Sequence, residues 1–240
     1  MTETELDRIR RAYRERDSAS DSPYRWDNPG YVSYMQSVER AVLRAVGDLG
    51  VPLAGARVLD VGCGSGYFLH RLMEYGAAEC HGIDLMEDRI SEGRKRYSTL
   101  DLRVGSATEL PYADGGFDLV TQFTCLSSIL DDEVRLAAAR EMRRVAARGW
   151  VLSFDVRGLR LRSSVLGHKD ARVATPTVSL DGRELRRLFG EPALLRRAAL
   201  AFELAQFTGR HPLLSAALGS LPQLCSHLLG IWRIPAARER

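Results

Sequence analysis

The chain has 240 residues, of which 45% are hydrophobic and 27% are charged, with 21 glycines and 9 prolines. These values exclude collagen-like, disordered and low-complexity proteins. The 34 basic and 31 acidic residues give a net charge of +3, which is too even for a nucleic-acid binder that depends on bulk electrostatics. We therefore expect no nucleic-acid partner.

The four cysteines, Cys63, Cys80, Cys125 and Cys225, show neither C-x-x-C spacing nor a zinc-like pattern with histidine. We therefore expect no metal and no disulfide framework. The first residues lack the basic and apolar regions of a signal peptide, and no apolar run approaches the length of a membrane span. These features predict a cytoplasmic protein without a membrane span, and they leave its oligomeric state open.

Two helices are predicted before the first strand. Apolar residues recur at helical spacing over 3–17 and again over 31–49, and the turn-rich segment 18–30 separates them. Gly50 and Pro52 end the second helix. We expect these helices to form an N-terminal cap.

A regular alternation of strands and helices follows. Short apolar strands are predicted at residues 57–61, 79–84, 102–104, 117–122 and 150–155. Helices are predicted at residues 67–75, 87–97 and 132–147. This alternation is typical of a doubly wound, parallel sheet.

The pattern loosens after the fifth strand. Residues 157–177 resemble an irregular insert, 181–189 a helix, and 194–207 a partly strand-like segment. Residues 211–229 predict one or two helices, and 229–234 a last short strand. The fold class is therefore α/β, a Rossmann-like, mostly parallel, seven-stranded sheet with helices on both faces and an N-terminal helical cap.

The strongest motif is the glycine-rich turn in VLDVGCGSGY at residues 58–67. A glycine loop between a strand and a helix lets a ligand approach the backbone and the helix N-terminus. Tyr67 stands where a dinucleotide fingerprint needs glycine or alanine, and no lysine has the spacing of a P-loop. The carboxylate of Asp60 would repel a pyrophosphate but would suit a ligand that carries an ammonium group.

Asp84 ends the second predicted strand, in CHGIDLM. Open α/β sheets place such an acid where it accepts hydrogen bonds from ribose hydroxyls. The alternative for an isolated aspartate is a helix N-cap, but its spacing from the glycine loop favours the ribose contact.

These segments resemble the class I S-adenosylmethionine-dependent methyltransferases, of the small type 11 methyltransferase-domain kind. The resemblance rests on VLDVGCGSGYF (58–68), HGIDLMEDRI (81–90), LRVGSATELPYADGGFDLVTQF (102–123) and LAAAREMRRVAARGWVLSFD (136–155). It implies a single methyltransferase domain over residues 1–240. Residues 1–50 would be a helical cap, 51–156 the cofactor-binding core, and 157–240 an acceptor-side insert with the last strands.

The resemblance also implies roles for residues of the glycine loop. Gly62, Gly64 and Gly66 would bring the backbone against the methionine moiety of S-adenosylmethionine. Cys63 between them would be a small packing residue, and Asp60 would face the ammonium group.

A second group would contact the rest of the cofactor. Asp84 would bind the ribose hydroxyls and Leu85 would lie against the adenine. Ser106 and Ala107 would border the adenine edge, although many relatives have aspartate where this chain has Ser106. Gln122, at the end of the fourth strand, would lie near the methionine part.

Methyl transfer requires that the acceptor atom is aligned with the methyl group and that water is excluded. An oxygen acceptor also needs a base or a metal. Asp155, at the end of the fifth strand, and His168, in the insert, are the candidate catalytic bases. A packing role is expected for His227, in a stretch predicted as helical.

Aromatic residues gather near the first two helices. Tyr24, Trp26 and Tyr34 either pack these helices onto the sheet or form a lid over the cofactor or the acceptor. Because large rings exclude water at little entropic cost, we expect a lid that orders when the cofactor binds.

Together these observations favour methyl transfer from S-adenosylmethionine to a small-molecule acceptor, at an oxygen of a natural-product or glycan intermediate. The alternatives are N- or C-methylation of a small molecule, and methylation of RNA or protein, against which the balanced charge counts. A scaffold that binds the cofactor without activity is the alternative outside enzymes. The intact set of Asp60, the loop glycines and Asp84 argues against it.

Overall fold

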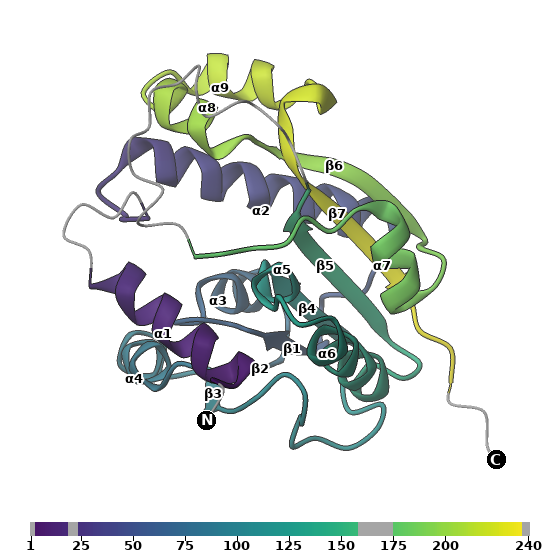
Figure 1. The fold of residues 1–240 in the computed structure, drawn as a ribbon. Helices are drawn as coiled ribbons and strands as arrows, with labels where there is room; N and C mark the ends of the chain where they lie inside the picture. Colours follow the sequence, from purple (N-terminus) through teal and green to yellow (C-terminus); the bar gives the residue numbers. More distant parts are fainter. Residues whose placement is uncertain (1–2, 19–23, 158–174, 237–240) are drawn as a thin grey trace.

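Seven strands form one sheet in the order β3-β2-β1-β4-β5-β7-β6 in the computed structural model, which describes residues 3–18, 24–157 and 175–236 (Figure 1). The strands are β1 (Arg57–Val61), β2 (Glu79–Asp84), β3 (Asp101–Val104), β4 (Leu119–Phe123), β5 (Trp150–Val156), β6 (Leu194–Leu200) and β7 (Cys225–Arg233). Only β7 runs antiparallel to its neighbours, β5 and β6. The predicted mostly parallel, seven-stranded sheet is confirmed.

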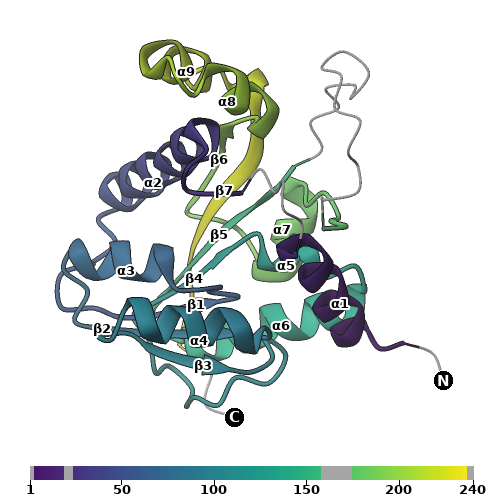
Figure 2. The same cartoon turned by 90° about the vertical axis from the view of Figure 1, so that its left-hand side faces the viewer.

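Helices cover both faces of this sheet (Figure 2). They are α1 (Glu5–Asp17), α2 (Pro29–Leu49), α3 (Tyr67–Glu74), α4 (Glu87–Arg96), α5 (Cys125–Ser128), α6 (Asp132–Val145), α7 (Gly182–Phe189), α8 (Phe202–Thr208) and α9 (Pro212–Gly219). One face carries α2, α3 and α4, and the other carries α6 and α7. The predicted N-terminal helices are present.

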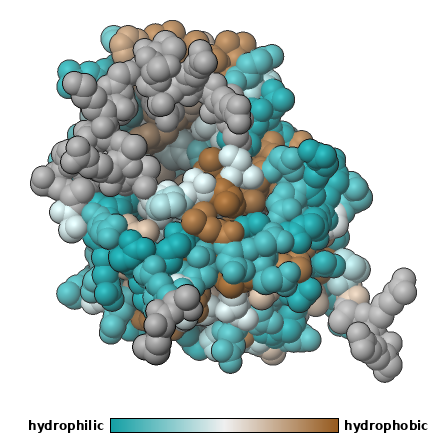
Figure 3. Space-filling model, viewed as in Figure 1, coloured by the Kyte–Doolittle hydropathy of each residue, from teal (hydrophilic) through white to brown (hydrophobic). Residues whose placement is uncertain are grey.

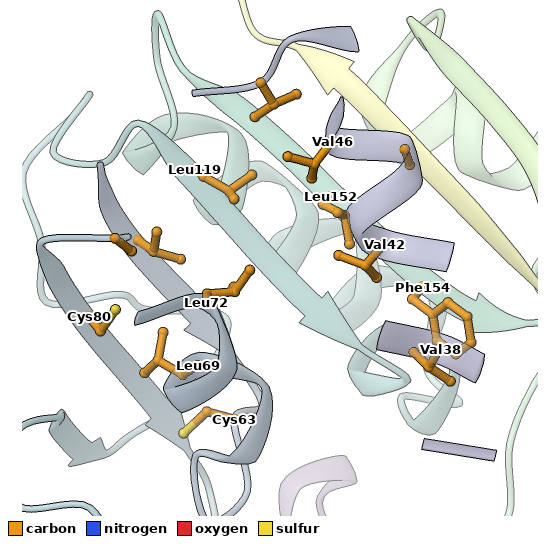
Figure 4. Packing of buried hydrophobic residues seen from close by; sticks show 14 of the residues in the cluster. Val38, Val42, Val46, Cys63, Leu69, Leu72, Cys80, Leu119, Leu152 and Phe154 are labelled. Atoms are coloured by element: carbon orange, nitrogen blue, oxygen red, sulfur yellow. The ribbon is translucent and has the colours of Figure 1, made fainter. Parts of the chain in front are cut away.

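The period of two in each strand divides the core between the two faces. Leu119 of β4 and Leu152 of β5 point to the α2–α3 face, whereas Val120 and Val151 pack on the α6–α7 side. In Figure 4, valines of α2 such as Val42 lie against this first layer together with leucines of α3. Each such buried side chain contributes about 1.5–3 kcal/mol, so the sheet edge that holds the functional residues has firm support.

The C-terminal region corrects two predictions. Residues 225–229 belong to β7 and not to a helix, and the strand-like stretch 194–207 divides into β6 and α8. Strand β7 lies inside the sheet and contributes side chains to the core on both faces, so its residues 228–232 form an apolar run without alternation. Periodicity cannot distinguish such a run from a buried helix.

The helix α1 lies apart from the sheet, over the carboxyl ends of its strands. Its Glu5 accepts a hydrogen bond from the Leu130 amide (2.6 Å), and the Tyr13 hydroxyl lies 2.9 Å from Ser128 Oγ. Both partners follow β4, so these contacts hold α1 near the edge where the loops of the sheet converge. Within the three described ranges, no helix combines the length and apolar character needed to cross a bilayer.

Candidate functional site

A cavity of about 930 Å³ opens at the carboxyl ends of β1, β2, β4 and β5. Open α/β sheets bind ligands at this edge, where the strand order reverses between β1 and β4. Hydrophobic side chains gather near the centre of the face in Figure 3, beside a hollow and within a mostly hydrophilic surface. The volume is at the upper end of the range for small-molecule sites.

The glycine loop forms one wall of this cavity. Gly62 and Gly64 have φ values of +75° and +56°, a region that favours glycine. A Cβ at Gly62 would lie 2.7 Å from Cys125 Cβ, so packing against the start of α5 requires this glycine. Apart from its own chain neighbours, no described residue has an atom within 4 Å of a Cβ built at Gly64, so the space beside Gly64 is open to a ligand.

Asp84 lies at the end of β2 and organises this loop. Its Oδ2 accepts a hydrogen bond from the Gly64 amide and its Oδ1 accepts one from the Met86 amide, both at 2.8 Å. Each carboxylate oxygen can accept a second hydrogen bond, and Asp84 lines the cavity. The N-cap of α4 is Met86 and not Asp84, so the N-cap alternative is wrong for this residue, and Asp84 keeps capacity for a ligand contact.

Asp60 is almost completely buried beside the loop. Its Oδ1 accepts a hydrogen bond from Thr121 Oγ1 at 2.8 Å. Burial, with a smaller contribution from the charge of Asp84, raises the pKa of Asp60 to about 7. Because Asp60 also lines the cavity, a ligand cation there would hold it in the ionised form.

The other residues predicted to bind the cofactor divide into two groups. Cys63, Leu85, Ser106 and Ala107 line the cavity with the loop. Burial raises the pKa of the Cys63 thiol well above its usual value, so this cysteine is protonated and suited to packing. Gly66 does not line the cavity; it is the N-cap of α3.

Gln122 and Asp155 lie in a fully buried network and do not line the cavity. The Gln122 amide donates to Asp155 Oδ2 and to Ser153 Oγ, and Asp155 Oδ1 accepts a hydrogen bond from the Ser127 amide at 3.0 Å. The Oε1 atom of Gln122 accepts a hydrogen bond from the Cys125 amide at 2.9 Å. Both side chains therefore hold the start of α5.

This placement corrects the expectation that Asp155 is a base and that Gln122 contacts the ligand. The side chain of Asp155 points into the layer between β4, β5 and α5, where burial raises its pKa and no acceptor can reach it. The other predicted base, His168, lies outside the described residues.

The opposite end of the cavity contains His227, which was predicted to lie in a helix and to have a packing role. His227 lies on β7 in register with Val156 of β5, and its ring stacks on Phe154 with centroids 4.6 Å apart. Its Nε2 lies 3.1 Å from Tyr34 Oη, and its Nδ1 lies 2.8 Å from Ser226 Oγ. Burial lowers the pKa of His227 to about 3, so the imidazole is neutral.

His227 was missed because its surroundings were predicted as a helix. In a strand, alternate side chains share a face, and this alternation directs the ring toward α2 and the cavity. The signal that could have found it is the run of apolar residues 228–232, which continues the strand predicted at 229–234.

The aromatic residues predicted as a lid line the same cavity. Tyr24 stacks on Phe202 of α8 at 5.1 Å, and Trp26 packs on Tyr67 of α3 at 4.6 Å. Tyr34 of α2 lies against His227. These rings join the N-terminal region to both ends of the cavity, a position that a cover over a ligand requires.

Among the residues that the structure describes, no group of three His, Cys, Asp or Glu side chains is arranged to hold a metal ion.

A methyltransferase-domain family matches residues 58–149. Norajmaline N-methyltransferase of Rauvolfia serpentina is 38% identical over 112 residues, which are 42% of this chain and 37% of that protein. Ubiquinone biosynthesis O-methyltransferase of Thiobacillus denitrificans is 34% identical over 131 residues, which are 52% of this chain and 55% of that protein. The chain thus spans between about a third and about half the length of these two relatives.

The fold extends beyond the part matched in sequence. The crystal structure of magnesium protoporphyrin IX methyltransferase from Synechocystis with bound S-adenosylmethionine superposes with a TM-score of 0.63 at 16% identity. The superposition covers 97% of this chain and 98% of that one. At this identity the likeness establishes the fold alone.

Proposed function

Because the chain belongs to the class I S-adenosylmethionine-dependent methyltransferases, we propose that it transfers a methyl group from S-adenosylmethionine to a small-molecule acceptor. The observation that carries this proposal is the convergence of Asp60, the open loop at Gly64 and Asp84 on one cavity. The bound cofactor supplies a methyl group that its sulfonium already activates. The chain has to bind the cofactor, align the acceptor and exclude water.

The residues of the loop end fit this cofactor. The open space at Gly64 leaves room for a ligand against the backbone, and Asp60 offers a carboxylate for its ammonium group. Asp84 retains acceptor capacity for the ribose hydroxyls. Leu85, Ser106 and Ala107 would enclose the adenine, with the Ser106 hydroxyl, 2.7 Å from Thr108 Oγ1, as a neutral polar contact.

The order of the strands sets the direction of the bound cofactor. Asp84 follows β2 and Asp60 belongs to β1, so the ribose and the methionine part would lie over these neighbouring strands. The acceptor would then lie over β4, β5 and β7, beside Phe154 and His227. We assign residues 51–156 to cofactor binding, and residues 1–50 and 157–240 to the acceptor side.

We place the methylated atom at an oxygen of a natural-product or glycan intermediate. The Tyr34 hydroxyl, positioned by His227, is the polar group that we expect to contact the acceptor hydroxyl. Because the pKa of His227 is lowered to about 3, the imidazole is a weak proton acceptor. This favours an acceptor whose hydroxyl ionises readily, such as a phenol or an acid.

Methylation at nitrogen is the second candidate, and the similarity to norajmaline N-methyltransferase favours it. An uncharged amine can act as the nucleophile once it is aligned, so it would need no base in the cavity. Methylation at carbon, and methylation of RNA or protein, remain alternatives that the assay below includes.

The test begins with ligand binding. S-adenosylhomocysteine should raise the melting temperature, as ligands of the native state do, whereas NAD should not. Labelled S-adenosylmethionine is then incubated with phenols, hydroxy acids, sugars and amines, and with RNA and a protein mixture. Binding with transfer to hydroxyl compounds supports the proposal. Binding without transfer to any acceptor indicates an inactive scaffold, and a shift with NAD alone would contradict the proposal.

We propose further that residues 1–35 close over the cavity when the cofactor binds. Hydrogen exchange measured with and without S-adenosylhomocysteine should show increased protection of the amides of Tyr24, Trp26 and Tyr34, as well as of the glycine loop. Protection that increases at the loop alone would assign these rings to ordinary packing.

A further inference from the structure

The acidic side chains that are described along the cavity lie at one end of it. Four acids lie on or next to β1, β2 and α4: Asp60, Asp84, Asp88 and Glu92. A fifth, Asp17 of α1, bonds to Arg89 at 2.8 Å. Among the described residues that line the cavity, none from β5, from β7 or from 175–208 is acidic.

Four of the arginines that the structure describes line the same cavity, and three of these four have a carboxylate partner. Arg16 and Arg89 both pair with Asp17, at 3.2 and 2.8 Å, and Arg25 pairs with Asp27 at 2.8 Å. Arg157 differs: within the described part of the chain its side chain has a hydrogen bond only to the Cys225 carbonyl, at 3.1 Å.

The position of Arg157 is well determined by the sheet. It follows β5 directly, and its amide donates to the Ser226 carbonyl at 2.9 Å, one residue before His227. Partial burial and the nearby charge of Arg197 lower the pKa of Arg157. A partly desolvated guanidinium that repels a second cation is stabilised by an anion, which the described protein does not supply.

The surroundings of Arg157 indicate what kind of molecule carries that anion. Phe154, Phe202 and Tyr34 present aromatic surface to the cavity at this end, and Thr177 adds a hydroxyl. An apolar cavity with a few convergent polar groups is typical of a site for a small organic molecule. A guanidinium binds a carboxylate or phosphate through two parallel hydrogen bonds.

We propose that Arg157 binds a carboxylate or phosphate group of the methyl acceptor, so that the substrates are anionic molecules with an aromatic or apolar body. This inference rests on the proposed function and specifies its substrate class. Arg157 is then a residue that determines specificity, because a neutral analogue would leave its charge partly buried and unpaired.

The alternative partner for Arg157 is the carboxylate of the cofactor itself. The sheet order argues against it, because β4 separates β5 from β1 and the glycine loop. With strands about 4.8 Å apart, this amounts to about 10 Å across the sheet. The experiment includes this alternative as a separate outcome.

The experiment uses the full chain saturated with S-adenosylhomocysteine. Calorimetry measures the binding of aromatic and aliphatic hydroxy acids, each paired with its methyl ester, and of aryl phosphates paired with the parent phenols. We expect at least one acid or phosphate to bind ten times more tightly than its neutral partner, and the series that does so identifies the anion.

Three variants locate the charge that is responsible. Arg157→Gln should abolish the preference for the anion, and Arg157→Lys should retain part of it. Arg197→Gln is the matched control, because it removes the same charge from an exposed neighbour that does not line the cavity. The preference of Arg197→Gln for the anion over its neutral partner should stay within twofold of that of the wild type. The melting temperatures of Arg197→Gln and Arg157→Gln should show that both variants fold.

Three results would overturn the inference. In the first, no anion binds more tightly than its neutral partner. In the second, Arg197→Gln reduces the preference as much as Arg157→Gln does. In the third, Arg157→Gln weakens S-adenosylhomocysteine binding more than tenfold, which would assign Arg157 to the cofactor carboxylate. If S-adenosylhomocysteine fails to bind the wild type, the proposed function itself is wrong, so the two failures are distinguishable.

Discussion

The two ends of the cavity are built in different ways. At the loop end, the Asp84 carboxylate accepts hydrogen bonds from backbone amides nearby in the chain, as from the Gly64 amide 20 residues earlier. At the other end, side chains meet across the whole sequence, as Tyr34 and His227 do at a separation of 193 residues. The loop end is acidic, and the other end is aromatic with Arg157, a cation that has no carboxylate partner in the described part of the chain.

This difference teaches how the binding of a shared cofactor and the choice of a particular acceptor can be separated. The loop end belongs to the segment that matches the methyltransferase-domain family, residues 58–149, whereas Tyr34, Phe154, Arg157 and His227 all lie outside it. If the proposed placement of the acceptor is right, changes at the second end alter the acceptor without disturbing the backbone contacts at the first. Predictions at Gly64, Asp84, Asp60 and Tyr34 examine this division.

The largest loss of affinity for S-adenosylhomocysteine is expected from a substitution of Gly64. Gly64→Ala and Gly50→Ala both place a methyl group where φ is close to +60°, and apart from the chain neighbours no described residue lies within 4 Å of it. Each should lose about 1–2 kcal/mol of stability from backbone strain. Only Gly64→Ala should weaken S-adenosylhomocysteine binding, by about a hundredfold, because its methyl group enters the cavity. Equal affinities of the two variants in calorimetry would show that the cofactor does not approach Gly64.

The next effect concerns Asp84. Asp84→Ala should weaken S-adenosylhomocysteine binding by about ten- to a hundredfold, because a charged hydrogen bond is worth about 1.5–3 kcal/mol. Asp84→Asn keeps one acceptor oxygen, so its loss of affinity should be smaller than that of Asp84→Ala. Both variants also release the Gly64 and Met86 amides, so thermal unfolding must be measured together with affinity. A fall in stability without a fall in affinity would reduce Asp84 to an organiser of the loop.

A smaller, pH-dependent effect is expected from Asp60. Its pKa of about 7 means that it becomes neutral as the pH falls below 7. The affinity for S-adenosylhomocysteine should therefore decrease from pH 8 to pH 6, by up to about tenfold per unit below the pKa. Asp60→Asn should bind more weakly at pH 8 and should lose this slope. The same slope in Asp60→Asn would assign the titration to another group.

The raised pKa of Asp60 has a separate consequence for stability. Between about pH 4 and pH 7 the folded protein keeps a proton on Asp60 that the unfolded chain releases. The contribution of Asp60 to the free energy of unfolding should therefore be largest at or below pH 4 and should fall as the pH rises to 7. Comparing wild type with Asp60→Asn by denaturant unfolding across this range isolates the contribution.

The smallest change in activity is expected from substitutions at the aromatic end of the cavity, at Tyr34 and His227. Tyr34→Phe should leave S-adenosylhomocysteine affinity unchanged and should lower kcat by about three- to tenfold, the loss of one hydrogen bond worth about 0.5–1.5 kcal/mol. His227→Gln keeps a polar side chain and should retain more activity than His227→Phe. If either His227 variant changes cofactor affinity as strongly as Asp84→Asn does, the two ends of the cavity are not independent.

The local sequence was sufficient to predict the strands and helices of the sheet core and most of the residues at the loop end of the cavity. In residues 57–84 each strand, turn and helix follows the last directly, so the glycines, Asp60 and Asp84 reach one edge through the topology of a parallel sheet. Chain order and strand direction thus bring them together without any distant contact.

Tertiary structure alone decided the direction of Asp155 and the place of His227. Asp155 ends its strand at the expected edge, but the alternation of β5 and the amide of Ser127 turn it into a buried network. His227 reaches the cavity because β7 inserts between β5 and β6. The apolar run 228–232 indicates a strand near His227, but the pairing with β5 and β6, which comes from backbone far away in the sequence, sets the register and the direction of the ring.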